Sequence, residues 1–530
     1  MSELLFRTED FRLDEVLEYF VETPADRRIV NSLKGRSPVI LKGSRGVGKS
    51  FLLRVAEVEL RSELSSSRNL PVYLTFARAG LIRQSTDGFL SWMIAKIASA
   101  VTRAIVANGL AVPPGTALSD LMTPSAGSPS STVDRVSAGF EQFWRDDSVP
   151  ETELLPEPEI LKEALADICD ALSLQRITLF VDEAAHVFIP NQQRQFFTLM
   201  RDLRSAHVSV KAAVYPGATA FGQSFQPSHD ATILSVERPI NDESYSTAMR
   251  EIVLKQASTQ SARQINQYGD AFDTLAFAAT GNPRILLKTF DRRSPFNSGH
   301  AQDTIRQYYR EEIWAEHSML ADRYPGHRLL IDWGRKFVEE DVLPALYHRN
   351  QSHEAQMSSA IWIHRDAPQA AREALSLLCY SGILQEGVSG IRATRSEIGT
   401  RYLINLGCNL AQAADPVSYG KDLRRQFDIR RMQEFGANHP AYRALEGFSV
   451  DAVENQGNVA LETRLAADIG QLDLTAFLRS KLQNDLGLTS IRDVLSASEY
   501  DFQKAHYVGR VRSRQMRNAA VTAVIEYLSG

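Results

Sequence analysis

The chain has few cysteines. Only three occur among its 530 residues, at Cys169, Cys379 and Cys408, and they lie far apart. This spacing offers neither a cluster of metal ligands nor a disulfide framework. Low cysteine usage of this kind is typical of a reducing cytosol, so we expect a cytoplasmic protein.

The chain also lacks segments that direct a protein to a membrane. The N-terminal residues Met1–Arg7 carry an acid early and have no long apolar core, so we expect no signal peptide. No apolar run approaches the ~20 residues that a membrane helix needs. A soluble intracellular protein with no membrane partner is therefore expected.

The chain also lacks a strong net charge. Its formal net charge of −5 excludes a surface that is basic overall, so any surface that binds nucleic acid must be a local basic patch. The composition, 44% hydrophobic and 23% charged, is that of a globular protein. The chain is too long for one compact core, and two to four domains are expected.

The strongest motif that is present is a phosphate-binding loop. An apolar strand is expected before it at residues 38–42, and a helix after it from Phe51. In this setting glycines let backbone N–H groups surround a phosphate at a helix N-terminus. Lys49 would bridge the β- and γ-phosphates of ATP, and Ser50 would bind Mg²⁺; the alternative is a glycine turn with a chance Lys-Ser. The loop fits G-x-x-x-x-G-K-[ST] and consists of Gly43, Ser44, Arg45, Gly46, Val47, Gly48, Lys49 and Ser50.

Two acids follow a second apolar strand. Residues 177–181 are β-rich and apolar, and Asp182 and Glu183 come directly after them. Asp182 would hold Mg²⁺ through water, and Glu183 would orient and deprotonate the attacking water, because hydrolysis needs charge neutralisation and water positioning. The alternative is an acidic turn after a strand.

Strands and helices alternate over the first half of the chain. Further strands are expected at 70–76, 208–215 and 232–236, with helices near 89–107, 160–172 and 192–206. This alternation predicts an α/β fold, with a parallel sheet covered by helices and ligands at the carboxyl ends of its strands. After Arg238 the pattern is helical, and Asn282 and Pro283 begin a helix that carries Arg284 in its first turn.

Together these motifs resemble the AAA+ and STAND ATPases, in particular the origin-recognition-complex-like branch, over about residues 10–300. The resemblance implies that Arg284 contacts the γ-phosphate and that Tyr215 occupies the place of a polar sensor. It also implies an oligomeric ATPase. However, Gly217–Asp230 contains no arginine or lysine to act as a finger. Arg201 or Arg204 could substitute, and a slow ATPase stimulated by assembly or DNA is expected.

Four parts are predicted along the chain: an ATPase core at 1–240 with a flexible insertion near 109–134, a helical lid at 241–325, a winged helix at 326–410 and a helical region at 411–530. Within the winged helix we expect a helix at 370–380, a strand at 381–385, a turn at 387–390 and a strand at 391–395. The basic run at 421–431 is interpreted as a solvated helix face.

The last helices resemble a helix-hairpin-helix module near residues 485–530. Val508 and Gly509 would form the hairpin, although Tyr507 stands where that pattern prefers a first glycine. From residue 501 onward, five basic residues against two acidic ones give a net charge of +3. Such a module grips the phosphate backbone of DNA; the alternative is a protein-binding module of the same shape. The residues expected to bind DNA are Gly509, Arg510, Arg512, Arg514 and Arg517.

Two functions remain open. The first is an ATP-controlled switch that binds DNA through its C-terminal half. The second is a signalling or scaffold ATPase whose C-terminal half binds a partner protein. The resemblance makes antiviral defence, DNA maintenance and mobile-element regulation possible settings for either.

Overall fold

The structure is a computed structural model, and the chain forms two compact units. The described residues are 4–77, 88–124, 130–146, 154–184, 190–216, 219–291, 295–323, 325–352, 356–393, 396–446 and 464–529. The first unit comprises Met1–Ser67, Lys211–Thr219 and Gln226–Asp451, and the second comprises Arg68–Val210, Ala220–Phe225 and Ala452–Gly530. The four-part division stays a prediction.

The main sheet has five strands in the order β2-β3-β4-β1-β5. Strand β1 pairs in parallel with β4 and β5, and β2 pairs in parallel with β3. Parallel neighbours need long crossover connections, which the intervening helices supply. The predicted α/β fold with a parallel sheet and intervening helices is confirmed, and all five expected strands are present. Their bounds are β1 Val39–Lys42, β2 Asn69–Thr75, β3 Arg176–Asp182, β4 Val208–Val214 and β5 Thr232–Ser235.

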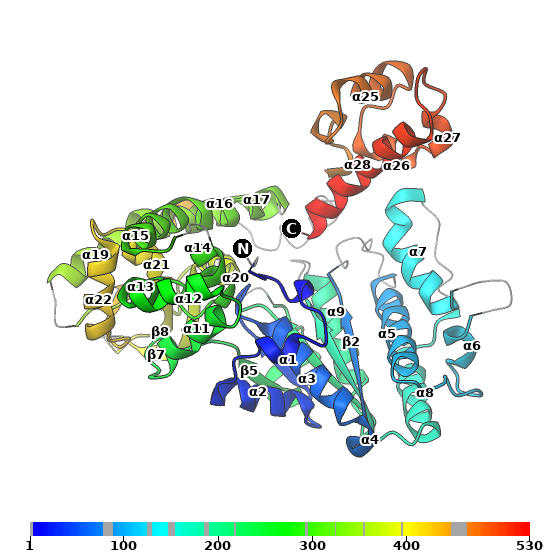
Figure 1. Ribbon diagram of the computed structural model, residues 1–530, viewed down its shortest axis with the longest axis horizontal. Helices are drawn as coiled ribbons and strands as arrows, with labels where there is room; N and C mark the ends of the chain where they lie inside the picture. The colour runs from blue at the N-terminus through cyan, green and yellow to red at the C-terminus, as the bar shows by residue number, and fades with distance from the viewer. Residues whose placement is uncertain are drawn as a thin grey trace. The chain divides into compact units, whose positions relative to one another are not determined.

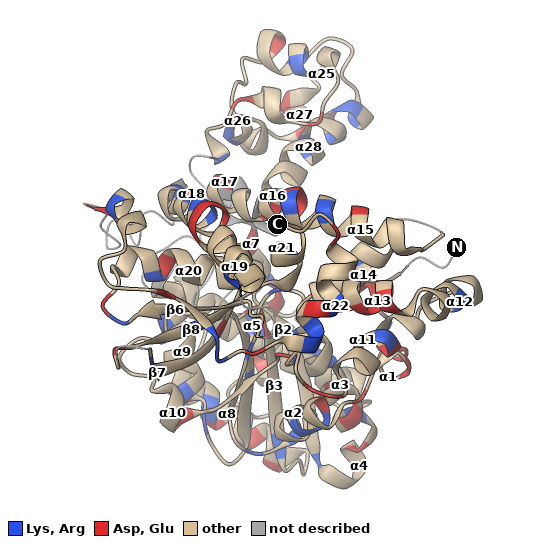
Figure 2. Ribbon diagram, turned by 90° about the vertical axis from the view of Figure 1, so that its left-hand side faces the viewer, with Lys and Arg blue, Asp and Glu red and all other residues tan. Residues whose placement is uncertain are grey.

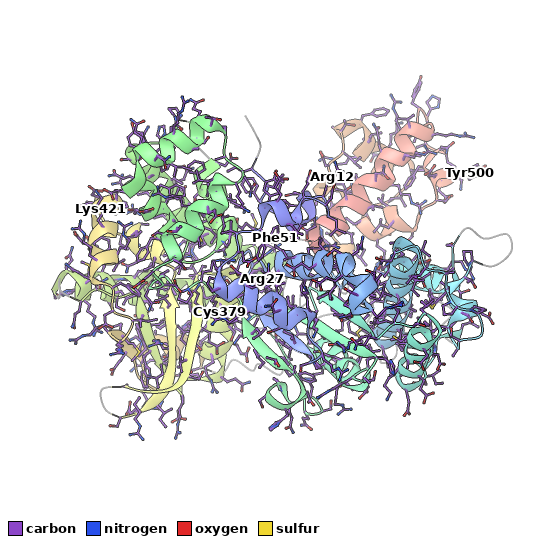
Figure 3. All side chains as sticks on the ribbon, turned by 60° about the horizontal axis from the view of Figure 1, so that its bottom comes forward. Arg12, Arg27, Phe51, Cys379, Lys421 and Tyr500 are labelled. Carbon is purple, nitrogen blue, oxygen red and sulfur yellow. The ribbon has the colours of Figure 1, made fainter. Side chains whose placement is uncertain are left out.

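Helices α2 (Pro24–Lys34) and α3 (Lys49–Ser62) pack on each other in the first unit. Helix α2 begins well because Pro24 stands in its first turn and the Thr23 side chain accepts from Asp26 N at 3.0 Å. Phe51 on α3 contacts Phe11 edge-on, with ring centroids 5.5 Å apart, and its label in Figure 3 marks this helix. The smaller N-terminal helices are α1 (Val16–Tyr19) and α4 (Leu64–Ser67).

The remainder of the first unit is mostly helical, as predicted, and its lid helices are green in Figure 1. The basic run at 421–431 lies partly on α22, where Lys421 pairs with Asp270 at 2.8 Å and Arg424 with Asp273 at 3.3 Å. These pairs tie α22 to α13, so the run is not purely a solvated face. The helices are α10 Pro227–Asp230, α11 Tyr245–Leu254, α12 Thr259–Gln267, α13 Gly269–Ala278, α14 Pro283–Asp291, α15 Ser298–Gln307, α16 Ile313–Ser318, α17 Leu320–Arg323, α18 Arg328–Lys336, α19 Leu343–Ser352, α20 Gln369–Ser381, α21 Leu406–Leu410 and α22 Pro416–Gln426.

A second sheet in this unit has the order β7-β8-β6-β9, helix α20 contacts β7, and α18 packs on α20. These elements lie in the region predicted to be a winged helix, and we keep that name for them. The expected turn at Gly387–Gly390 was wrong, because these residues lie inside β7. The pairing register shifts twice there, and Gly390 has a φ of 77°, so glycines absorb a bulge rather than make the turn. The second strand therefore begins at Ile398 rather than Ile391. The strands are β6 Ala360–His364, β7 Leu384–Arg392, β8 Ile398–Ile404 and β9 Met432–Phe435.

In the second unit, the segment expected to be a flexible insertion contains packed structure. Its short helix α6 (Ser119–Met122) buries Met122, and the preceding Leu118 is fully buried. The sequence pattern did not indicate this burial, because many prolines and serines flank Leu118 and Met122. Residues 125–129 of the segment lie outside the described part of the chain. The other helices of this stretch are α5 Gly88–Ala107, α7 Thr132–Asp146, α8 Pro158–Ala171 and α9 Pro190–Asp202.

Helix α5 corrects the expectation that no apolar stretch approaches the length of a membrane span. Its 20 residues, with a mean hydropathy of 1.4, are long and apolar enough to cross a membrane. However, 67% of the stretch is buried inside the protein, and Trp92 and Val101 are fully buried. A helix with apolar residues on all sides is also what a core position requires.

The C-terminal residues 464–529 have a hydrophobic core of their own, which includes Leu482, Ile491, Phe502 and Met516. Capping boxes start two of its helices: Ser490 pairs with Asp493, and Ser498 with Asp501. We call this part the C-terminal module. Its helices are α25 Ala476–Ser480, α26 Ile491–Ser496, α27 Glu499–Phe502 and α28 Arg510–Ser529.

Candidate functional site

The backbone of the loop Gly43–Ser50 follows β1 and enters α3 at Lys49. Gly46 and Gly48 have φ values of 87° and 101°, in the left-handed region that favours glycine. A Cβ atom on Gly46 would also lie 2.7 Å from Asn282 Oδ1. These positions need glycine for conformation and for space, which makes a chance Gly-rich turn a poor explanation of the motif.

Lys49 is buried, and its ammonium group has defined partners. Nζ donates to Gly43 O at 2.7 Å and to Ser44 O at 3.0 Å. It also lies 4.0 Å from the centroid of the Tyr215 ring, at the end of β4. A cation over a ring face is stabilised by the ring quadrupole. The loop therefore curls around the side chain that the sequence assigns to the β- and γ-phosphates.

Arg284 lies in the first turn of α14, as predicted, and gathers with other cations near the loop. Its Nε donates to Phe6 O at 3.1 Å. Burial lowers the pKa of Arg284, and the charge of Arg45 lowers it further, while Tyr215 and Glu9 act in the opposite direction. Cations that repel one another are stabilised when an anion binds among them. Lys49, Arg45 and Arg284 thus suit a phosphate chain.

Two polar side chains hold the loop in place through contacts that sequence reasoning missed. Asn282, predicted as a helix cap, accepts from Ile285 N and also donates from Nδ2 to Arg45 O at 2.7 Å. Arg238 donates to Val47 O at 2.8 Å and pairs with the buried Asp26 at 3.2 Å. Both contacts join residues distant in sequence, so no local pattern could have indicated them.

The winged helix touches the same loop through the C-terminal end of α20. Arg45 N donates to Tyr380 O at 3.4 Å, and the rings of Tyr215 and Tyr380 pack edge-on with centroids 4.8 Å apart. The neighbouring strand β7 adds an ion pair of 2.8 Å between Glu386 and Lys42 of β1. Lid and winged helix therefore both reach the backbone of the phosphate-binding loop.

Asp182 and Glu183 lie in the second unit, at the carboxyl end of β3. Tyr73 Oη donates to Asp182 Oδ2 at 2.6 Å, and Glu183 N donates to Asp182 Oδ1 at 3.0 Å. Glu183 has a φ of 54°, an uncommon conformation for a side chain of its size. These contacts orient the Asp182 carboxylate, whose oxygen atoms are ligands of the kind that Mg²⁺ prefers. Their roles with a nucleotide stay predictions.

The arginines expected as substitute fingers belong to the same unit. Arg201, near the end of α9, pairs with Asp202 at 2.8 Å and donates to Ser224 O at 3.0 Å. Helix α9 ends at Asp202, so Arg204 follows the helix rather than lying on it. The role of Arg201 or Arg204 as an arginine finger stays a prediction.

The predicted DNA-binding residues come together at the start of α28 in the C-terminal module. Arg510, Arg512 and Arg514 are exposed, and Arg517 is half-buried. Arg514 lies 3.6 Å from Glu499, whereas no ion pair joins Arg510 or Arg517 to an acid within the described residues. Figure 2 shows the basic and acidic residues of α25–α28 against the uncharged remainder. Gly509, just before α28, is also exposed.

A comparison with protein families supports the resemblance for the N-terminal part of the chain. Residues 4–81 match the family model described as ORC-CDC6-like, which confirms the resemblance over the segment that contains the phosphate-binding loop. A search of curated proteins found no match.

Two solved structures from Aeropyrum pernix are similar at low scores. The ORC1 protein in complex with DNA has 16% identity and a TM-score of 0.31, covering 77% of this chain and 94% of its own. The ORC2 protein, in ADPNP–ADP complexes, has 10% identity and a TM-score of 0.35, covering 78% of this chain and 97% of its own. Scores this low carry no argument about the function of this chain.

Proposed function

We propose that this protein is an ATP-controlled switch that binds DNA through its C-terminal module. The proposal that the protein binds ATP rests on the position of Lys49. This residue is buried in a loop with two glycines in the left-handed region, and Arg45 and Arg284 lie near the same loop. This arrangement suits a triphosphate, because backbone N–H groups and cations converge on one anion. Asp182 and Glu183 supply the acids that Mg²⁺ binding and slow hydrolysis require.

The lid and winged helix supply a physical link between nucleotide and the rest of the first unit. Asn282 of the lid and Tyr380 of the winged helix both contact Arg45 of the loop. A phosphate that accepts hydrogen bonds from the N–H groups of the loop competes with their present acceptors, such as Tyr380 O at Arg45 N. Nucleotide state would therefore bias the positions of both parts, as two-state switching requires.

The DNA half of the proposal rests on the arginines of the C-terminal module. Arg510 and Arg517 have no acidic partner among the described residues, so their charges are available to phosphates. Contacts of this kind fix a protein on DNA with little regard to sequence. The second candidate, a scaffold ATPase that binds a protein partner, is favoured by the exposed large side chains of the same module, among them Tyr500, Tyr507 and Val511.

DNA binding by the full chain with Arg510, Arg514 and Arg517 changed to Glu tests the DNA half. We expect binding to fall by roughly 100-fold, because reversing three phosphate contacts removes most of the counterion-release term. The matched control changes Arg425, Arg430 and Arg431 to Glu, three exposed basic residues outside the module, and should bind DNA like the parent. Unchanged binding in the first variant would favour the protein-binding candidate.

A further inference from the structure

We propose that Tyr507 stacks on an unpaired base and that the substrate class of the C-terminal module is single-stranded DNA. The inference rests on the DNA-binding function proposed above and adds the form of DNA that is recognised. It concerns the turn Tyr507–Gly509, at which the chain enters α28.

Tyr507 combines backbone strain with exposure. Its φ is 66°, in the region that glycine normally occupies, and its side chain remains 72% exposed. A glycine would remove the strain, and the Tyr507 ring contributes little to the core because it is mostly in water. A large residue kept in a strained and exposed position suggests a role in binding rather than in folding.

The turn holds the ring on a rigid support. The buried Val508 donates from its N to Ala505 O at 3.1 Å, and Ser513 N donates to Gly509 O at 3.0 Å. Arg512 Nη1 donates to Tyr507 O at 2.5 Å, and its guanidinium lies 5.2 Å from the centroid of the Phe477 ring. Arg512 is thus engaged inside the module and acts as a positioning residue for Tyr507 rather than as a phosphate contact.

Other flat or apolar side chains surround Tyr507. The ring of His506 lies 4.2 Å from that of Tyr507 between centroids, and His506 is exposed. Val511, the second residue of α28, is 73% exposed. Arg510 is exposed beside them, so apolar faces and positive charge occur together at one end of the helix.

Single-stranded DNA is the partner that fits this combination. Every base has a face on which an aromatic ring can stack, and such stacking tolerates any sequence. In duplex DNA both faces of each base are covered by neighbouring base pairs, so an exposed tyrosine adds nothing to phosphate contacts. The positive charge of Arg510, Arg514 and Arg517 complements the phosphate backbone of the same strand.

The experiment measures binding of the full chain to an oligodeoxythymidine of about 20 nucleotides, longer than typical single-domain footprints, and to a duplex of equal length. Tyr507→Gly is the informative variant, because it removes the ring and relieves the strain at a φ of 66°. We expect its affinity for the single strand to fall about ten-fold and its affinity for the duplex to stay within about two-fold. Tyr507→Phe keeps a stacking ring and should bind like the parent.

Tyr500→Ala is the matched control. Tyr500 is 74% exposed on α27, at the periphery of the module in Figure 3, but Lys504 already lies 5.5 Å from its ring centroid. We expect this variant to bind both forms of DNA normally. A single-strand affinity that is unchanged in Tyr507→Gly, or equally reduced in Tyr500→Ala, would overturn the inference.

The two proposals fail in different ways. If changing Arg510, Arg514 and Arg517 to Glu abolishes binding while Tyr507→Gly lowers single-strand and duplex affinity equally, DNA binding stands and the stacking inference falls. If the arginine variant binds DNA normally, the proposed function itself falls. Fluorescence of a 2-aminopurine base in the oligonucleotide gives a second readout, since stacking by Tyr507 quenches it and the Gly variant should not.

Discussion

The ammonium of Lys49 lies 4.0 Å from the centroid of the Tyr215 ring, and that ring packs against Tyr380 of the winged helix. One aromatic pair therefore connects the side chain that is predicted to hold ATP phosphates with the end of α20. A polar sensor is expected at the Tyr215 position by resemblance. The Tyr215 ring instead contacts the Lys49 cation with its face and packs edge-on against the ring of Tyr380.

Lys49→Ala should weaken ATP binding by roughly 100-fold, because charge-assisted hydrogen bonds to phosphate are lost. Titration calorimetry with ATP measures the effect. Lys42→Ala serves as the control, since Lys42 is a nearby lysine that pairs with Glu386 instead of curling into the loop. Tight ATP binding by the Lys49 variant would place the nucleotide elsewhere.

Glu183→Gln should retain ATP binding and lower the rate of hydrolysis by about 100-fold or more, because the amide cannot accept a proton from the attacking water. Phosphate release under single-turnover conditions measures this step. Asp202→Asn, at the end of α9, is a matched change of an acid in the same unit. Turnover equal to that of the parent protein in Glu183→Gln would move the general base to another residue.

Tyr380→Ala should destabilise the protein by about 3–5 kcal/mol, the usual cost of truncating a buried aromatic side chain, and should speed the release of bound nucleotide. The faster release follows because Tyr380 packs on the ring that contacts Lys49. Tyr380→Phe keeps the ring and provides the control. Stopped-flow measurement with a fluorescent ATP analogue gives the rate, and an unchanged rate in Tyr380→Ala would show that the winged helix does not influence the loop.

Acidification should destabilise the protein through His317, whose Nδ1 lies 2.8 Å from Ser381 Oγ at the end of α20. Burial lowers the pKa of His317 from 6.5 to about 4, with a smaller contribution from Arg335. A group with a depressed folded-state pKa contributes stability that is complete above pH 6.5 and is lost as the pH falls through about 4. The loss should be on the order of 3 kcal/mol.

Urea unfolding between pH 7 and pH 4 checks this sign, with His317→Gln as the comparison. Glutamine cannot gain the charge, so the free energy of unfolding of this variant should fall less steeply with acidification than that of the parent. Parallel pH profiles for the two proteins would contradict the assignment.

Local motifs predicted the parts of the site that depend on neighbouring residues. Gly46, Gly48 and Lys49 are close in sequence, and their spacing alone indicated the loop. Arg238 and Tyr380 could not be found in this way, because they reach the loop across 191 and 335 residues of chain, respectively. Their contacts depend on how lid and winged helix pack, and sequence patterns of single elements carry no such information.

The same limit explains the errors in the fold. The pattern at Gly387 and Gly390 predicts a turn, but long strands also use glycine where their pairing register shifts. At residues 109–134, the many prolines and serines predict a flexible insertion. Two apolar residues among them, Leu118 and Met122, are nevertheless buried. The strands of the main sheet were predicted well because buried parallel strands are short apolar runs with clear boundaries.

Coupling between the nucleotide site and DNA is measured by DNA binding of the full chain with ATP, with ADP and without nucleotide. Anisotropy of a labelled oligodeoxythymidine gives the affinity in each state, and Lys49→Ala serves as the nucleotide-blind control. The affinity for DNA should differ between ATP and the other two states by about five-fold or more in the parent protein, the usual lower range of coupling between two sites. The Lys49 variant should show no such difference. Equal DNA affinity of the parent protein in all three states, or no DNA binding in any of them, would show that the protein is not an ATP-controlled DNA switch.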